Sequence, residues 1–175
     1  MRIASVVSDS IVDGPGLRFT VFTQGCPHRC PGCHNPDTHD PAGGRAVSVA
    51  DLAAQLLANP LTGGLTLSGG EPFLQAEACA QLSRIARAHG LNIWVYTGYT
   101  YEQLLEQGDP ACLALLDAAD VLVDGPFLLA QRSYDTLFRG SANQRLIDLP
   151  RSRAAGRAVL WTRPDPLAHF TVPDS

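Results

Sequence analysis

Three cysteines that lie close together constrain this chain most. Cys26, Cys30 and Cys33 fall within residues 24–40, a segment that also contains three prolines and two glycines. Proline fixes φ and removes a backbone donor, whereas glycine permits turns that are closed to other residues. The segment is therefore expected to be a compact loop rather than a continuous helix or strand. Three thiolates presented by one short loop predict a metal site.

The number of cysteines separates two kinds of metal site. A structural zinc ion usually takes four protein ligands, often as two CxxC or CxxH pairs, but Cys79 and Cys112 lie alone in apolar segments and are expected to be small core residues. Three thiolates on a [4Fe–4S] cluster leave one iron open to another ligand. We favour the cluster. A zinc knuckle remains the alternative, completed by one of three histidines: His28, His34 or His39.

Composition narrows the class of protein. The 175 residues fit one domain with a real core. The net charge is −4, and the 13 basic residues are all arginines scattered along the chain, so nucleic acid is an unfavourable ligand. No apolar stretch approaches the length of a membrane span, about 20 residues. We expect a cytoplasmic protein, where the thiols stay reduced.

Alternating strand and helix patterns predict an α/β fold. Expected strands cover residues 17–23, 65–67, 92–96 and 119–123, and expected helices cover residues 49–58, 76–89 and 101–118. This order is typical of right-handed parallel βαβ units. A full β/α barrel takes about 250 residues, so we expect an incomplete, partial parallel β/α barrel.

The two ends of the chain are less regular. Residues 1–12 are expected to form a short strand or extended arm, and residues 146–149 a fifth strand. Residues 150–156 look like a surface connection, residues 158–161 like a possible last strand, and the chain from residue 163 like a frayed tail. We therefore expect one domain over residues 1–175, with a core at about 12–149 and a C-terminal extension over 150–175.

Candidate ligand-binding residues follow the expected strands. Gly69 and Gly70 end the second one, where the absence of Cβ atoms lets a ligand approach the backbone. Thr97 follows the third strand and is expected to line the same site. Asp124 follows the fourth strand, and its carboxylate would bind a ribose hydroxyl or an amine. The alternative for Asp124 is that it caps amides of its own loop.

These motifs together resemble one protein family. CxxxCxxC followed by GGEP is similar to the radical S-adenosylmethionine (SAM) enzymes, and the run from DGPG to the last cysteine resembles the glycyl-radical-enzyme activating proteins. LVDGPF and RGSANQ are most similar to the activating proteins of anaerobic ribonucleoside-triphosphate reductase. The resemblance covers about residues 12–149. It implies a partial barrel of the radical SAM type.

The resemblance also implies the residues of the cofactor site. Cys26, Cys30 and Cys33 would hold a [4Fe–4S] cluster, with SAM on the open iron. The position before the last cysteine, often aromatic in the superfamily, is Gly32, so the adenine contact would come from elsewhere, with His34 or Tyr96 as candidates. The full set expected at SAM is Gly32, His34, Ser68, Gly69, Gly70, Glu71, Thr97 and Asp124.

The activity implied by the resemblance is generation of a glycyl radical. Flavodoxin or ferredoxin would reduce the cluster, SAM would be cleaved to methionine and a 5′-deoxyadenosyl radical, and this radical would take a hydrogen atom from a glycine of anaerobic ribonucleoside-triphosphate reductase. Three alternatives stay open: an activase of another glycyl radical enzyme such as pyruvate formate-lyase, a small-molecule radical SAM enzyme such as a deazaguanine synthase, and a zinc-knuckle binding module.

Overall fold

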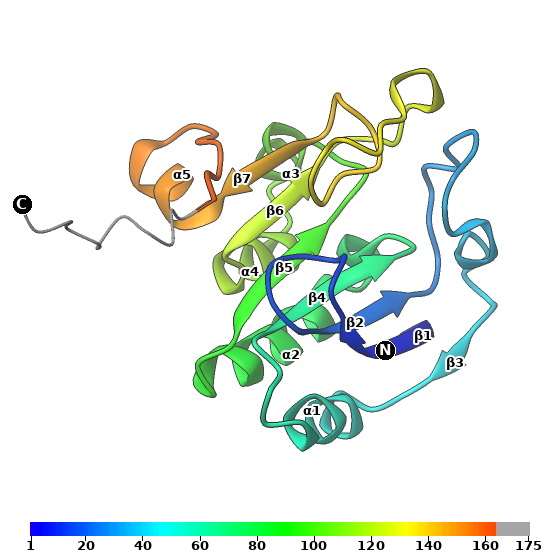
Figure 1. Cartoon of the computed structure of the whole chain (residues 1–175), viewed down its shortest axis with the longest axis vertical. Coiled ribbons are helices and arrows are strands. Elements are labelled where there is room, and N and C mark those ends of the chain that lie inside the picture. Colours follow the sequence, from blue (N-terminus) through cyan, green and yellow to red (C-terminus); the bar gives the residue numbers. More distant parts are fainter. Residues whose placement is uncertain (164–175) are drawn as a thin grey trace, which may run out of the picture.

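The computed structural model describes residues 1–163, in which seven strands form one sheet in the order β3-β1-β2-β4-β5-β6-β7 (Figure 1). The strands are β1 Arg2–Ser10, β2 Arg18–Thr23, β3 Arg45–Ala46, β4 Gly64–Gly69, β5 Asn92–Tyr96, β6 Val121–Asp124 and β7 Arg145–Asp148. The helices are α1 Val49–Ala58, α2 Ala76–Ala88, α3 Tyr101–Gln107, α4 Pro110–Ala118 and α5 Leu149–Ala155. Within the described part of the chain, no helix combines the length and apolar character needed to cross a membrane.

Four adjacent parallel strands form the centre of the sheet. β2 pairs with β4, β4 with β5, and β5 with β6, all in parallel. α1 connects the first pair, α2 the second, and α3 and α4 the third, as expected because parallel strands need a crossover connection. These strands and helices confirm the predicted α/β class and place the carboxyl ends of the four strands at one edge of the sheet.

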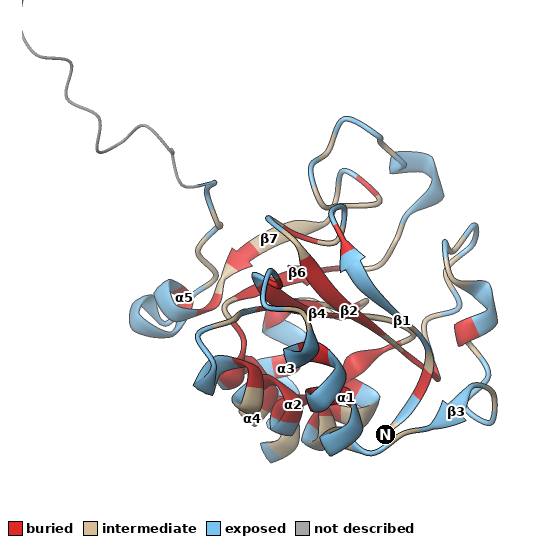
Figure 2. Ribbon diagram, turned by 60° about the horizontal axis from the view of Figure 1, so that its bottom comes forward, coloured by how far each residue is buried: buried red, intermediate tan, exposed pale blue. Residues whose placement is uncertain are grey.

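The sheet is buried on both faces. Figure 2 shows α1 to α4 on one side, and the larger core lies between them and the sheet, with fully buried residues such as Leu52, Leu67 and Leu82. On the opposite face, Trp94 and Val123 belong to a smaller cluster that Phe138 and Trp161 cover. Helices on only one face leave the other free for connecting loops.

The predicted parallel array is confirmed for the four central strands, whereas the strands outside them, for which no direction was predicted, are antiparallel. β1 runs antiparallel to β2, β3 antiparallel to β1, and β7 antiparallel to β6. In the described chain, the connection between β6 and β7 contains only a 3-10 helix of 3 residues, Leu129–Gln131, and no α-helix that crosses the sheet, so the chain returns from the same edge in the opposite direction. β3 and β7 are the outer strands among residues 1–163. The structure thus confirms a mixed α/β sheet, and does not confirm a barrel.

The end of the described chain also differs from expectation. Residues predicted as a surface connection form α5, whose N-cap Asp148 accepts a hydrogen bond from the Arg151 N–H at 2.9 Å. Proline in the first turn favours a helix start, and this signal was available in the sequence. The possible last strand is reduced to one bridge between Ile147 and Leu160. The predicted frayed tail lies almost wholly outside the described residues.

A buried arginine joins the first loop to the sheet. Arg18 is fully buried, and all five of its N–H groups donate hydrogen bonds. The acceptors are Thr66 Oγ1 and the Leu65 carbonyl at 2.6 Å each, both oxygens of Asn92, and the carbonyl of Pro15. Burial lowers the pKa of Arg18 to about 10. Arg18 thereby fixes the DGPG loop against β4 and β5.

Candidate functional site

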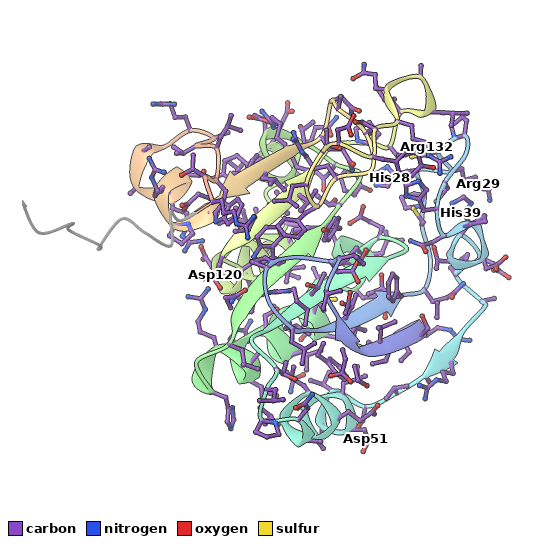
Figure 3. The ribbon with its side chains drawn as sticks, viewed as in Figure 1. His28, Arg29, His39, Asp51, Asp120 and Arg132 are labelled. Atoms are coloured by element: carbon purple, nitrogen blue, oxygen red, sulfur yellow. The ribbon has the colours of Figure 1, made fainter. Side chains whose placement is uncertain are left out.

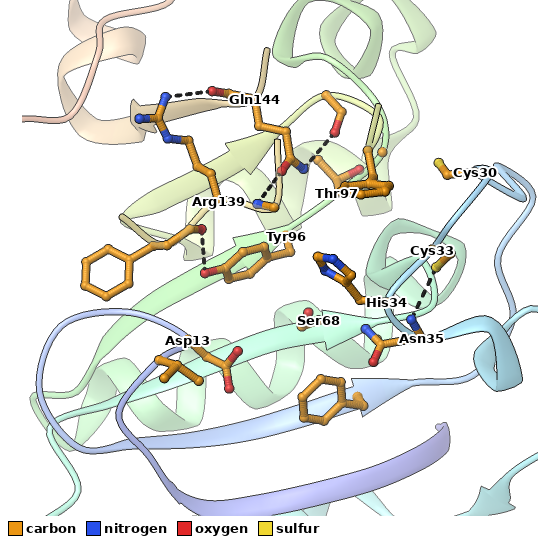
Figure 4. Close-up of a pocket in the computed structure, with 18 of the residues that line it drawn as sticks. Asp13, Cys30, Cys33, His34, Asn35, Ser68, Tyr96, Thr97, Arg139 and Gln144 are labelled. Carbon is orange, nitrogen blue, oxygen red and sulfur yellow. Dashed lines mark hydrogen bonds between the residues drawn. The ribbon is translucent and has the colours of Figure 1, made fainter. Parts of the chain in front are cut away.

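A cavity of about 760 Å³ opens at the carboxyl ends of the parallel strands. The three cysteines line one part of it, and residues that follow β4, β5 and β6 line another (Figure 4). Carboxyl ends of adjacent parallel strands are the usual binding edge of α/β sheets. In Figure 4 Cys30 and Cys33 lie at one end of the cavity and Arg139 at the other. The site predicted from scattered motifs is therefore largely assembled around one space.

The cysteine loop begins just after β2. Cys26, Cys30 and Cys33 are free thiols of intermediate exposure. The Cys33 N–H donates to the Cys30 carbonyl at 3.1 Å, and the Asn35 N–H donates to the Cys33 sulfur at 3.4 Å. Burial raises the pKa of the Cys26 thiol, while hydrogen bonds from the backbone N–H groups of His28 and Arg29 act in the opposite direction. The loop thus carries its own donors to sulfur.

The donor set fits an iron–sulfur cluster. In such a cluster each thiolate binds a different iron, whereas a single zinc ion needs ligands that converge at about 2.0–2.3 Å. Among residues 1–163, no group of three or more His, Cys, Asp or Glu side chains is arranged around one metal ion. Two of the three histidines of the zinc alternative have other neighbours: His28 contacts Glu71, and the His34 ring lies 4.7 Å from that of Phe127.

The two glycines at the end of β4 are packed closely on one side by the chain itself. A Cβ atom at Gly70 would lie 2.3 Å from the Gly25 carbonyl oxygen, and one at Gly69, where φ is +95°, would lie 2.6 Å from Phe22 Cα. The Gly70 N–H also donates to the Thr23 carbonyl at 2.8 Å. Both glycines line the cavity together with Ser68. They therefore hold the end of β2 beside the site while exposing backbone to it.

Thr97 and His34 also line the cavity, but Gly32 and Glu71 are absent from its lining in the described chain. A Cβ atom at Gly32, where φ is +71°, would lie 2.9 Å from Leu129 Cδ1. Leu129 covers this glycine, so an aromatic side chain would not fit here without movement. Glu71 is fully buried and bonded within the protein.

Asp124 has a structural environment. Its carboxylate accepts hydrogen bonds from Arg145 at 3.0 and 2.5 Å and from the Tyr101 N–H at 2.8 Å, at the start of α3. The side chain is 1% exposed and is not one of the cavity-lining groups of residues 1–163, although Gly125 beside it is. Arg145 also pairs with Glu102 at 2.6 Å, and these two carboxylates raise its pKa. The carboxylate therefore caps the start of α3 and pairs with Arg145. Within residues 1–163 it bonds no amide of its own loop, although the alternative for Asp124 supposed such bonds.

Several further residues line the cavity. Asp13 had no assigned role in the sequence, nor had Arg139 and Gln144 of the RGSANQ run, whereas Tyr96 was a candidate for the adenine contact. Arg139 Nη1 donates to the Gln144 carbonyl at 3.0 Å, and Gln144 Nε2 donates to the Gly125 carbonyl at 3.1 Å. The Tyr96 hydroxyl donates to the Phe138 carbonyl at 3.0 Å. The available signal was the polar composition of RGSANQ, whose residues hold the loop over the cavity.

Comparison with known proteins identifies the relatives of this chain. Residues 12–147 match the family described as 4Fe-4S single cluster domain. An anaerobic ribonucleoside-triphosphate reductase-activating protein of Vibrio cholerae is 38% identical over 145 residues, covering 77% of this chain and 89% of that protein. A second protein of that name, from Salmonella typhimurium, is 34% identical over 155 residues, covering 82% of this chain and 96% of its own length.

Activating enzymes of pyruvate formate-lyase are also similar. The enzyme of Clostridium pasteurianum is 41% identical over 133 residues, covering 71% of this chain but 55% of the relative. Pyruvate formate-lyase 1-activating enzyme of Escherichia coli K12 is 34% identical over 167 residues, covering 93% of this chain and 66% of the relative. The chain spans less than two thirds of the length of either enzyme. On these matches, the chain belongs to the family of radical SAM activating proteins of glycyl radical enzymes, with a 4Fe-4S single cluster domain.

Proposed function

We propose that this protein cleaves SAM reductively at a [4Fe–4S] cluster and thereby generates a glycyl radical on anaerobic ribonucleoside-triphosphate reductase. The observation that carries the proposal is that three free thiols and a glycine-rich strand end share the walls of one cavity. Its volume of about 760 Å³ lies within the usual range for small-molecule sites, about 300–1,000 Å³. Membership of the activase family supports the same activity.

Cys26, Cys30 and Cys33 would hold the cluster. When bound, the cluster would supply the electron for reductive cleavage of SAM, which would release methionine and provide the means of removing a hydrogen atom from the target glycine. The residues of this chain would bind and orient SAM and exclude water from the site. A glycine is a suitable target because no side chain blocks access to its Cα atom.

SAM would lie between the cysteine loop and the strand ends. Ser68, Gly69, Gly70, Thr97 and His34 line the cavity and would contact it. The other predicted residues are Gly32, Glu71 and Asp124. Gly32 has no side chain, and the carboxylates of Glu71 and Asp124 accept hydrogen bonds within the protein, so these residues would act by holding the backbone of the site in place. We further propose that residues 1–175 belong to one domain, and that the sheet within residues 1–163 corresponds to a partial β/α barrel.

The reductase is the favoured target because the LVDGPF and RGSANQ runs are most similar to its activating proteins. Two proteins of that name are 38% and 34% identical to this chain. Activation of pyruvate formate-lyase remains the second candidate because the clostridial enzyme is 41% identical over the shared region. Flavodoxin or ferredoxin would be the electron donor.

Anaerobic reconstitution with iron and sulfide tests the cofactor chemistry. The reduced protein should produce 5′-deoxyadenosine from SAM, and Cys26→Ala, Cys30→Ala and Cys33→Ala should each abolish this product while the protein still folds. Cys112→Ala is the matched control, because this buried thiol lies outside the cysteine loop. Undiminished product from any of the three loop variants would overturn the ligand assignment.

A further inference from the structure

The carboxylate of Glu71 is buried, and its salt-bridge partner is a histidine, His28, rather than an arginine. The Glu71 side chain is 0% exposed, and it lies just after β4, behind the two glycines of the cavity wall. Moving a carboxylate out of water is unfavourable unless hydrogen bonds replace the lost hydration. The donors that surround Glu71 therefore reveal which parts of the protein it joins.

Three separate segments donate to this carboxylate. Oε2 accepts from His28 Nε2 at 2.8 Å and from the Gly98 N–H at 2.9 Å, and Oε1 accepts from the Phe73 N–H at 3.1 Å. The Thr97 hydroxyl lies 3.0 Å from both oxygens. Because an ionised carboxylate only accepts, His28 contributes its Nε2–H. Glu71 thus connects the cysteine loop to the ends of β4 and β5.

His28 is also held by its packing. Its ring lies edge-on to Tyr99, with the ring centroids 4.5 Å apart. On another side it contacts Gly98 so closely that a Cβ atom there would lie 2.4 Å from His28 Cδ2. Figure 3 shows His28 at the same end of the molecule as Arg132, and both line the cavity. A side chain fixed by a hydrogen bond and by two neighbours has little rotational freedom.

The position of His28 in the sequence gives these contacts a consequence. It lies midway between Cys26 and Cys30, two residues from each. We infer that His28 is a positioning residue: its hydrogen bond to Glu71 fixes the cysteine loop in the cluster-free protein, so that the thiols are ordered beside Gly69 and Gly70 before the cluster is inserted. The identity of the group that the thiols bind rests on the proposed function, but the ordering of the loop does not.

Hydrogen–deuterium exchange of the cluster-free protein tests the inference. Loss of one hydrogen bond to a buried charge should lower the protection of residues 26–35 in His28→Ala by about tenfold, after correction for intrinsic exchange rates. His28→Gln, whose amide can donate to the same oxygen, should stay within about twofold of the natural protein. Arg29→Ala is the matched control, since it changes the neighbouring exposed side chain of the same loop.

A second variant perturbs the loop from a distance. Glu71→Gln keeps the side-chain shape but replaces one acceptor by a donor, so it should also increase exchange in residues 26–35, where no residue is changed. Equal protection of residues 26–35 in His28→Ala and the natural protein would overturn the inference. Protection in His28→Gln as low as in His28→Ala would also overturn it. This assay uses neither metal nor SAM, so failure of SAM cleavage would affect only the proposed function.

The reconstituted protein gives an independent readout. His28→Ala should lose iron to a chelator about tenfold faster than the natural protein, and His28→Gln should restore most of the difference. Identical rates of iron loss in all three proteins would contradict ordering of the loop by His28.

Discussion

The contact between Gly98 and His28 leads to a stability prediction with a specific magnitude. In Gly98→Ala the new methyl group would lie 2.4 Å from His28 Cδ2 and 2.6 Å from Nε2, where an ordinary contact is at least 3.4 Å. The ring must therefore retreat by about 1 Å, because carbon atoms repel steeply inside their contact distance. A hydrogen bond of 2.8 Å to Glu71 does not survive that displacement.

Two opposing terms set the size of the effect. A buried charged group that loses one hydrogen bond costs about 1.5–3 kcal/mol. Glycine to alanine alone stabilises by about 0.4–1 kcal/mol through the unfolded chain where the backbone permits it. Gly98 permits alanine, since its φ is not positive. The free energy of unfolding should therefore fall by about 1–2 kcal/mol.

Urea unfolding of the cluster-free protein under reducing conditions measures this change. With a slope of about 2 kcal/mol per molar, the midpoint should fall by about 0.5–1 M. Gly63→Ala is the matched control: its φ is not positive either, and the nearest atom to its Cβ would be the Leu17 carbonyl oxygen at 3.6 Å. A Gly98→Ala protein as stable as Gly63→Ala would refute the packing of His28 described above.

Three further predictions concern buried or paired charges. Arg18→Ala leaves its acceptors on β4 and β5 unpaired and should lower the free energy of unfolding by about 3 kcal/mol, measured by urea denaturation. Asp124→Asn should lower it by about 3 kcal/mol in the same assay, because Arg145 loses a buried partner. Hydrogen bonding to Arg145 lowers the pKa of Glu102, so this stabilisation is present above the ordinary value of 4.5 and is lost as the pH falls through the folded-state pKa. In Glu102→Gln the free energy of unfolding, measured by urea denaturation at several pH values, should therefore fall less steeply as the pH is lowered. The difference should be less than about 1 kcal/mol, since the pair is exposed.

Local patterns were sufficient to predict the centre of the fold. The apolar runs that became β2, β4, β5 and β6 and the helical segments between them have periods that short windows of sequence reveal. The cysteine loop and the two glycines were recognisable because each motif is contiguous and therefore also lies within a short window of sequence. Their meeting at one edge follows from parallel pairing.

Contacts between distant residues could not be predicted in the same way. The directions of β1 and β7 depend on how their connections cross the sheet, which composition does not specify. Asp124 was expected to bind a ligand, and its partner Arg145 lies 21 residues further along the chain. Glu71 likewise accepts a bond from His28, 43 residues before it. Carboxylates at strand ends look alike in sequence whether they face a ligand or a buried donor.

The most direct test of the proposed activity is electron paramagnetic resonance of the anaerobic ribonucleoside-triphosphate reductase after incubation with the reconstituted protein, SAM and a reductant. The proposal predicts a glycyl radical signal on the reductase that requires all three components and disappears with Cys33→Ala, and no such signal on pyruvate formate-lyase under the same conditions. A signal on pyruvate formate-lyase alone would move the activity to the second candidate target. No signal on either enzyme, with a protein that cleaves SAM, would contradict activation of a glycyl radical enzyme.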